Sequence, residues 1–278
     1  MTEPSSVEQQ RCYRHADREA YITCQRCERL ICPECMRDAS VGFQCPECVA
    51  EGSKSVRAPR TLAGGAVSAR EGVVTMTLLG INVVAFVLQL ATEGRDNSLF
   101  QMGAMHGYSV ALGDDYWRLL TAAFLHGGFL HIAFNMYALY LFGPFVERAL
   151  GTWRFVVAYL TMAVASSVFV YWLTAPQVAT IGASGAVFGL FGLALVLLVK
   201  AKQDVRTLLV LLLINGFISL QGNISWQGHL GGFLTGLLLG AAVAYAPRAR
   251  RPAILTATFA LTWLAIVAAT VLRTVQIV

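Results

Sequence analysis

The sequence predicts an all-α protein with several membrane-spanning helices, preceded by a small cysteine-rich head. Charged residues make up 13% of the 278 residues, about half the share found in ordinary soluble domains. From Leu119 to the C-terminus the sequence has two carboxylates, Glu147 and Asp204, among long apolar runs. All seven cysteines lie between Cys12 and Cys48. This distribution excludes a single soluble globular domain and indicates a membrane body joined to a separate head.

The chain divides into four predicted segments. They are a head (1–50), a flexible linker rich in Gly, Ala, Ser and Arg (51–71), a core of six transmembrane helices (72–248) and an additional C-terminal transmembrane helix (249–278). The seven apolar stretches have about the 20 residues that a membrane-spanning helix needs, although the fifth is short. They are residues 73–92, 122–146, 155–173, 179–199, 207–221, 226–246 and 253–272.

Basic residues predict how the helices cross the membrane. They cluster before the first span and between the second and third, the fourth and fifth, and the sixth and seventh spans, whereas loops 174–178 and 222–225 have none. Because basic residues favour the cytoplasmic side, the N-terminus is expected in the cytoplasm and the C-terminus outside. No secretory signal is apparent before the head. We expect a multi-pass protein of a bacterial plasma membrane.

Polar side chains recur at one depth in three predicted spans. In this orientation the second, fourth and sixth spans all begin near the outer surface. Polar residues lie in these outer ends: His126, His131 and Asn135 in the second, Ser184 in the fourth and His229 in the sixth. Ionisable residues inside a bilayer are costly and usually face a cavity or a partner. A shared site is therefore expected.

Ser184 and His229 are the candidate nucleophile and base. Ser184 lies between Gly182 and Gly185 where an apolar helix begins, and unpaired backbone N–H groups at a helix start favour a developing oxyanion. His229 begins a ladder of glycines at intervals of four, which would let the two helices pack closely. The ladder consists of Gly228, Gly232, Gly236 and Gly240. Either feature alone is also typical of simple helix packing; together they favour catalysis.

Other residues have expected supporting roles. His131 and Asn135 share a helix face and can donate hydrogen bonds to an oxyanion. His126 is expected to fix the helix entrance, and Phe188 either to stack on the base or to pack in the core. The outer halves of the later spans have no carboxylate, so we expect a Ser–His dyad without an acidic third member.

Together these motifs resemble the rhomboid intramembrane serine proteases. The resemblance covers about residues 73–245 and rests on several motifs in order: Tyr116-Trp117-Arg118, His126, His131 with Asn135, Gly182-Ala183-Ser184-Gly185, and His229 followed by Gly232 and Gly236. It implies a six-helix rhomboid core with a seventh helix of the "six plus one" variant, and a partly embedded first loop. Phe188 departs from the tyrosine of many relatives.

The resemblance also implies a function. Ser184 would attack a transmembrane-anchored protein substrate near the outer face of the lipid bilayer, His229 would be the base, and His131, Asn135 and the Ser184 amide would stabilise the oxyanion, without a cofactor for catalysis. The alternative is a catalytically inactive rhomboid-like protein that binds or escorts client proteins. Such proteins usually lack the serine or the base.

Two further classes fit the sequence less well. A zinc transporter would use His126, His131 and His229 as ligands, but the core has no intramembrane carboxylates to compensate the charge of the ion. A metalloprotease is disfavoured because the sequence has no His-Glu-x-x-His motif.

The head contains four evenly spaced ligand pairs. They are Cys12 with His15, Cys24 with Cys27, Cys32 with Cys35, and Cys45 with Cys48. Eight such ligands match two structural Zn²⁺ ions, which would stabilise a segment too short for a large core. The pattern is similar to B-box and other cross-braced fingers, which implies that alternate pairs share an ion; sequential pairing stays open.

The balance of charges in the head indicates which class of partner it binds. The first 70 residues hold ten basic against nine acidic side chains. We therefore expect a cytoplasmic protein partner and no nucleic acid.

Overall fold

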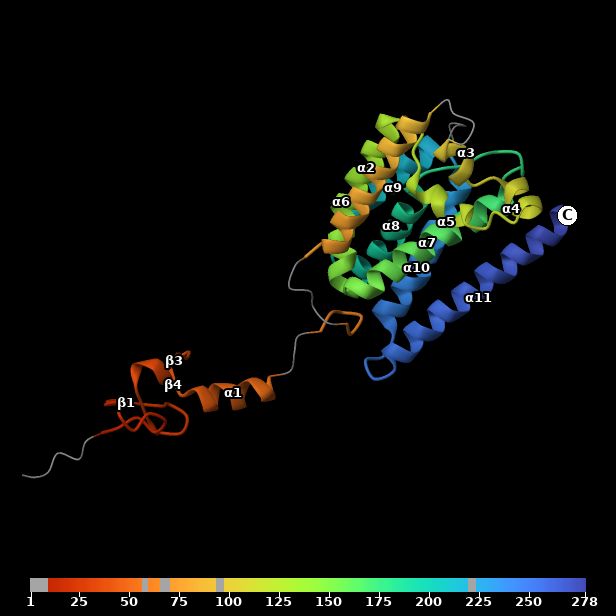
Figure 1. Cartoon of the computed structure of the whole chain (residues 1–278). Coiled ribbons are helices and arrows are strands. Elements are labelled where there is room, and N and C mark those ends of the chain that lie inside the picture. Colours follow the sequence, from red (N-terminus) through yellow and green to blue (C-terminus); the bar gives the residue numbers. More distant parts are fainter. Residues whose placement is uncertain (1–9, 57–59, 66–70, 94–97, 220–223) are drawn as a thin grey trace, which may run out of the picture. The chain divides into compact units, whose positions relative to one another are not determined.

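The computed structural model describes residues 10–56, 60–65, 71–93, 98–219 and 224–278, and the chain forms two compact units (Figure 1). The first unit is Met1–Pro59 and the second is Arg60–Val278. The division between them falls inside the segment predicted to be a linker, and helix α1 extends to Ser55 within that segment.

The head has little regular structure apart from two small hairpins and one helix. Its elements are β1 (Ile22–Thr23), β2 (Leu30–Ile31), the 3-10 helix η1 (Pro33–Cys35), β3 (Arg37–Asp38), β4 (Phe43–Gln44) and α1 (Pro46–Ser55). Strand β1 pairs antiparallel with β2, and β3 with β4. The buried core of the head consists mainly of cysteines. Since so few apolar side chains are buried, this unit depends on its cysteines for stability.

The second unit is a bundle of helices (Figure 1). Its longer helices are α2 (Val73–Thr92), α6 (Phe129–Leu150), α7 (Thr152–Leu173), α8 (Ser184–Lys200), α9 (Arg206–Ser219), α10 (Trp226–Tyr245) and α11 (Arg251–Ile277). Each of the seven predicted spans therefore overlaps one of these helices. Among the described residues, five helices are long and apolar enough to cross a membrane; α8 and α9 are shorter. Helices α7 and α8 supply most of the buried core, whereas α6 exposes large apolar side chains such as Phe129 and Phe134, as a lipid-facing helix does.

Two helices begin later than the sequence predicts. The second span was expected from residue 122, but residues Ala122–Phe124 form a 3-10 turn and α6 begins at Phe129. The cause is Gly128, whose φ of 152° is incompatible with a helix. The fourth span was expected from residue 179, but α8 begins at Ser184 because residues before it are extended, with Thr180 bridging to Met105. Ser184 is consequently the first residue of its helix.

The glycine ladder brings α8 and α10 into direct backbone contact. A Cβ atom on Gly232 would overlap the carbonyl oxygen of Gly185, and a Cβ atom on Gly236 would overlap that of Gly189. Backbones can approach this closely only where both helices present glycine. The contact fixes the position of α8 along α10, and with it the positions of the polar residues in their N-terminal turns.

The segment between α2 and α6 folds into short helices held by Arg118. These helices are α3 (Leu99–Gly103), α4 (Gly107–Gly113) and α5 (Arg118–Thr121). The Arg118 guanidinium contacts Asp115 at 2.7 Å and donates to the backbone oxygens of Gln101 and Ala104. Arg118 is 9% exposed. Its buried guanidinium holds the loop together by donating hydrogen bonds to carbonyl oxygens that have no donor within a helix.

A buried carboxylate joins the start of α2 to α6. Glu147, 3% exposed, accepts hydrogen bonds from the backbone N–H of Val74 and from the N–H and hydroxyl of Thr75, at 2.8 to 3.0 Å. These N–H groups belong to the first turn of α2 and have no acceptor within their own helix. Glu147 therefore caps α2 from a neighbouring helix.

Replacing Glu147 with alanine is expected to lower the free energy of unfolding by about 3 kcal/mol, because three buried donors lose their acceptor. The measurement is thermal unfolding in detergent. Glu71→Ala is the matched control: Glu71 is 66% exposed and pairs with Arg148, which is 62% exposed. An exposed ion pair contributes at most about 1 kcal/mol. Equal losses from the two substitutions would contradict the capping role.

Helix α11 packs along α7 through polar contacts in an otherwise apolar interface. Trp263 donates to the Thr161 hydroxyl at 3.1 Å, and Trp172 donates to the Ala269 carbonyl at 3.0 Å. Arg273 donates to the Tyr171 carbonyl at 3.0 Å. The added C-terminal helix is thus a fixed part of the bundle.

Candidate functional site

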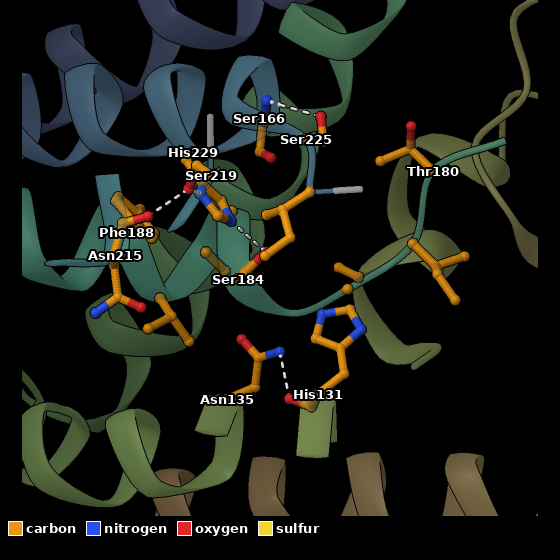
Figure 2. Close-up of a pocket in the computed structure, with 18 of the residues that line it drawn as sticks. His131, Asn135, Ser166, Thr180, Ser184, Phe188, Asn215, Ser219, Ser225 and His229 are labelled. Atoms are coloured by element: carbon orange, nitrogen blue, oxygen red, sulfur yellow. Dashed lines mark hydrogen bonds between the residues drawn. The ribbon is translucent and has the colours of Figure 1, made fainter. Parts of the chain in front are cut away.

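Ser184 and His229 are hydrogen-bonded to each other. Ser184 Oγ lies 2.7 Å from His229 Nε2 (Figure 2). Ser184 is the first residue of α8, and His229 is in the first turn of α10, where Ser225 caps the helix by accepting from the Gly228 N–H. The two side chains, 45 residues apart in the sequence, meet because the glycine faces of α8 and α10 pack against each other.

The ring of His229 is held by stacking as well. Phe188, one turn after Ser184 on α8, lies parallel to the imidazole with ring centroids 4.0 Å apart and an interplanar angle of 8°. His229 is buried. The structure shows both roles expected for Phe188: it stacks on the candidate base and belongs to the buried core of the bundle.

His229 also has a contact on its second nitrogen. Ser219, the last residue of α9, has its Oγ 2.7 Å from His229 Nδ1. No acidic side chain is among the residues that line the cavity in the described part of the chain. The group that contacts His229 Nδ1 is therefore the neutral hydroxyl of Ser219.

His131 lies on the other side of Ser184 and presents a donor to the site. Its Nδ1 accepts from the Gly127 N–H at 3.2 Å, so the neutral ring carries its proton on Nε2. A Cβ atom on Gly182 would lie 2.8 Å from His131 Nε2 and 3.5 Å from Ser184 Oγ. Gly182, whose φ is +135°, therefore lies against both the N–H donor of His131 and the Ser184 hydroxyl, and a side chain at this position would strike the imidazole.

Asn135 is on the same face of α6 one turn further along, and Figure 2 shows both side chains rising from α6 toward Ser184. One of its amide N–H groups donates to the His131 carbonyl at 2.9 Å. The amide has a second N–H. His131 and Asn135 are therefore brought beside Ser184, as the sequence predicts.

His126 and Gly185 lie where the elements that carry the site residues are held together. His126 precedes α6 and is fully buried; its backbone N–H and C=O are both bonded by the side-chain amide of Gln89 on α2. A Cβ atom on Gly185 would overlap Ser166 of α7 and lie 3.3 Å from the Gly228 carbonyl. Gly185 is thus the point where α7, α8 and α10 converge behind Ser184.

His131, Asn135, Ser184 and His229 line a large cavity between the helices. Its volume is about 1160 Å³, and its walls come from α6, α7, α8, α9 and α10. Apolar side chains such as Phe134 and Ile214 form much of the wall, while the polar groups gather around Ser184. A cavity of this size can hold a segment of polypeptide beside the hydroxyl.

The eight ligand residues of the head form two groups, and the pairs alternate. Within each group all the ligand atoms lie within 4.8 Å of one another. The first group is Cys12, His15, Cys32 and Cys35; the second is Cys24, Cys27, Cys45 and Cys48. The first and third pairs therefore share one group, and the second and fourth share the other. This is the cross-braced arrangement, and the sequential alternative is excluded.

The spacing within the groups fits a tetrahedral metal ion. Sulfur ligands about 2.3 Å from Zn²⁺ lie about 3.8 Å apart, and Cys27 Sγ and Cys45 Sγ are separated by 3.8 Å. His15 Nδ1 lies 3.4 Å from the sulfurs of Cys32 and Cys35. All seven cysteines are free of disulfide bonds. Both groups can hold a metal.

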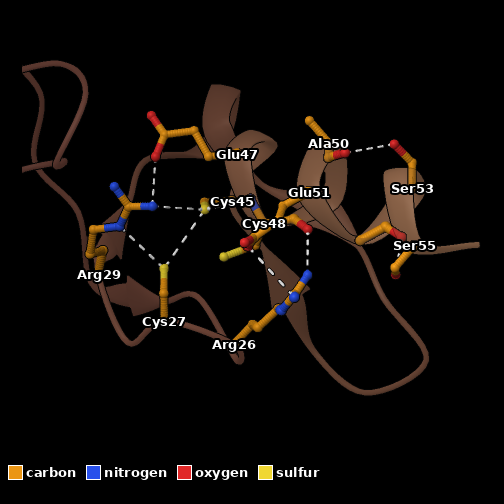
Figure 3. Close-up of polar contacts among 11 residues, drawn as sticks. Arg26, Cys27, Arg29, Cys45, Glu47, Cys48, Ala50, Glu51, Ser53 and Ser55 are labelled. Carbon is orange, nitrogen blue, oxygen red and sulfur yellow. Dashed lines mark hydrogen bonds and ion pairs between the residues drawn. The ribbon is translucent and has the colours of Figure 1, made fainter.

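Neighbouring donors favour the ionised sulfurs that a metal requires (Figure 3). Arg29 donates to Cys27 Sγ at 3.2 Å while its second arm pairs with Glu47 at 2.6 Å. Burial opposes ionisation of the Cys24 thiol, but the backbone N–H groups of Cys45 and its other neighbours lower its pKa to about 6. Burial raises the pKa of the Cys35 thiol to about 11 and that of the Cys48 thiol to about 12. The head therefore favours some of its thiolates before any ion binds, and a bound metal would favour ionisation of the others.

Comparison with known proteins identifies the family. The model of the Rhomboid domain matches residues 113–246. The protein YdcA of Bacillus subtilis is 34% identical over 142 residues, which cover 48% of this chain and 70% of YdcA. The chain belongs to the rhomboid family. The predicted family and the all-α, multi-pass membrane fold of the rhomboid type are thereby confirmed.

Two further rhomboids show the same relationship. Rhomboid protease GluP of Bacillus subtilis is 36% identical over 179 residues, covering 61% of this chain and 34% of GluP. Rhomboid protease AarA of Providencia stuartii is 25% identical over 218 residues, covering 66% of this chain and 77% of AarA. The chain spans about a third of GluP but most of AarA. Both relatives are rhomboid proteases.

One residue of the rhomboid site was not predicted from the sequence. Ser219 is the last residue of α9, ten residues before His229. The partners considered for the base in the sequence were carboxylates, and a serine near the end of an apolar span is not distinctive. The available signal was its place at the expected outer end of the fifth span, the depth also expected for Ser184 and His229.

Proposed function

We propose that this rhomboid is an intramembrane endopeptidase in which Ser184 is the nucleophile and His229 the general base. The observation that carries the proposal is the 2.7 Å hydrogen bond between Ser184 Oγ and His229 Nε2. A serine is a weak nucleophile unless a base accepts its proton, and the hydrogen bond provides the path for that transfer.

In the proposed mechanism, Ser184 Oγ attacks a peptide carbonyl while His229 Nε2 takes its proton. The negative charge that develops on the carbonyl oxygen is stabilised by the Ser184 N–H at the start of α8 and by His131 Nε2–H, with the Asn135 amide as a further donor. His229 then protonates the leaving amine. Water entering the cavity deacylates Ser184, again with His229 as base.

The proposed substrates are membrane-anchored proteins cut near the outer face of the bilayer. A helical substrate hides its carbonyls in i→i−4 hydrogen bonds, so the cleaved segment must unwind. Small or helix-breaking residues near the scissile bond are therefore expected. The distribution of basic loops supports a cytoplasmic N-terminus and an external C-terminus. The proposed location is a bacterial plasma membrane.

For the head we propose two structural Zn²⁺ ions and a cytoplasmic protein partner. Two groups of soft sulfur and imidazole ligands at tetrahedral spacing support zinc. The ions would cross-link the strands and turns of the head, and they would take no part in proteolysis. The nearly balanced charge of the first 70 residues supports a protein partner.

The proposed function is tested by reconstituting the purified protein in liposomes with a single-span substrate protein. The expected result is one main cut within the outer part of the substrate helix, located by mass spectrometry, on the side opposite the head. Substrate that binds stably and stays intact would contradict the proposal and favour the inactive, client-binding alternative.

A further inference from the structure

Ser219 approaches the nitrogen of His229 that faces away from Ser184 (Figure 2). Its Oγ lies 2.7 Å from His229 Nδ1, and the residue is 3% exposed. Of the residues of α9, Leu208 and Ser219 are the buried ones. The outer end of α9 therefore meets the rest of the bundle at the ring of the candidate base.

The direction of this hydrogen bond follows from counting protons. Ser219 Oγ also lies 2.6 Å from the backbone oxygen of Asn215, which can only accept. The hydroxyl has one proton, and with that proton directed at Asn215 it can only accept from His229. Nδ1 must then carry the hydrogen of the neutral ring. Nε2 is left with a free lone pair, 2.7 Å from Ser184 Oγ.

We infer that Ser219 is a positioning residue, which holds His229 in the Nδ1–H tautomer and so keeps Nε2 available for the Ser184 proton. The inference rests on the proposed function. When His229 takes the proton from Ser184, its Nδ1–H still donates to Ser219, so the same hydroxyl stabilises the charged ring. Ser219 thus does with a neutral group what a carboxylate does in serine proteases of soluble folds.

The surroundings explain why a hydroxyl is suitable here. A carboxylate in this position would be buried within the membrane, where charge is costly. A hydroxyl turned the other way would donate to Nδ1 and place the ring hydrogen on Nε2, and a ring with that hydrogen cannot accept from Ser184. The Asn215 carbonyl, one helical turn before Ser219, sets the productive direction.

The first test compares Ser219→Thr with Ser219→Val, which have the same shape and differ in the hydroxyl. In liposomes, Ser219→Val is expected to lower kcat about 10- to 100-fold with little change in KM, as for a lost hydrogen bond to a charged group. Ser219→Thr should restore most of the loss. Equal kcat values for the two variants and the wild type would overturn the inference. Absence of cleavage by the wild type would instead contradict the proposed function.

A second measurement needs no variant that might alter folding of α9. Solid-state NMR of protein labelled with ¹⁵N-histidine, at about pH 8 where histidine is neutral, reports which ring nitrogen of His229 carries hydrogen. His229→Gln identifies the signal among the five histidines. A protonated Nδ1 with an unprotonated Nε2 is expected. The opposite tautomer would overturn the inference even if the enzyme is active.

Discussion

Replacing Ser184 with alanine is expected to reduce cleavage of a transmembrane substrate by about 10⁴-fold or more, to the background rate. The substitution removes the only atom that forms the acyl-enzyme in the proposed mechanism. The protein should otherwise be intact, because Cβ remains and the α8–α10 contact is made by glycines. Initial rates in liposomes, with the thermal unfolding midpoint recorded for each protein, provide the measurement.

His229→Ala is expected to cause a loss of similar size, and the double variant should be no worse than either single one. Two residues that act as one unit give non-additive losses. Ser109→Ala removes a hydroxyl on α4, outside the residues that line the cavity, and serves as the control that keeps most of its activity. Independent, multiplying losses from Ser184→Ala and His229→Ala would show that the two residues do not act together.

Removal of metal is expected to unfold the head while leaving proteolysis largely intact. Structural zinc in small fingers contributes about 10 to 16 kcal/mol at neutral pH, and the head buries little besides its cysteines. Amide hydrogen exchange of the full-length protein, before and after chelation, should show loss of protection in residues 10–55. Residues of α7 and α8 provide the internal control and should not change.

Metal analysis should find about two zinc ions per chain before chelation, in keeping with the two ligand groups. Cys24→Ser should remove one of them and weaken protection of the head without lowering cleavage by more than a small factor. Protection of the head that persists after its metal is stripped would contradict the proposed stabilising role.

The sequence predicted the positions of the helices well because a helix that crosses a bilayer needs about 20 predominantly apolar residues in a row. The first span, residues 73–92, coincides with α2. The meeting of Ser184 and His229 was predictable for a local reason: glycines at intervals of four allow one geometry of close packing. The alternation of ligand pairs in the head came from resemblance, since spacing alone permits sequential pairing as well.

One feature was missed for a local reason: the late start of α6 follows from the φ of Gly128, which lies inside the predicted span 122–146. Other features depend on contacts between distant segments, which periodicity does not reveal. The role of Ser219 depends on the end of α9 reaching the His229 ring, and that approach depends on how α9 packs. The hydrogen bonds from Gln89 on α2 to the backbone of His126 could not be predicted from the sequence either.

The most direct test of the account is covalent capture of the nucleophile. Wild-type protein in liposomes would be treated with a fluorophosphonate, digested and sequenced by mass spectrometry. A single major adduct on Ser184 is expected, and it should be strongly reduced in His229→Ala because the base no longer activates the hydroxyl. An adduct on another serine, or equal labelling of Ser184 without His229, would contradict the Ser184–His229 dyad.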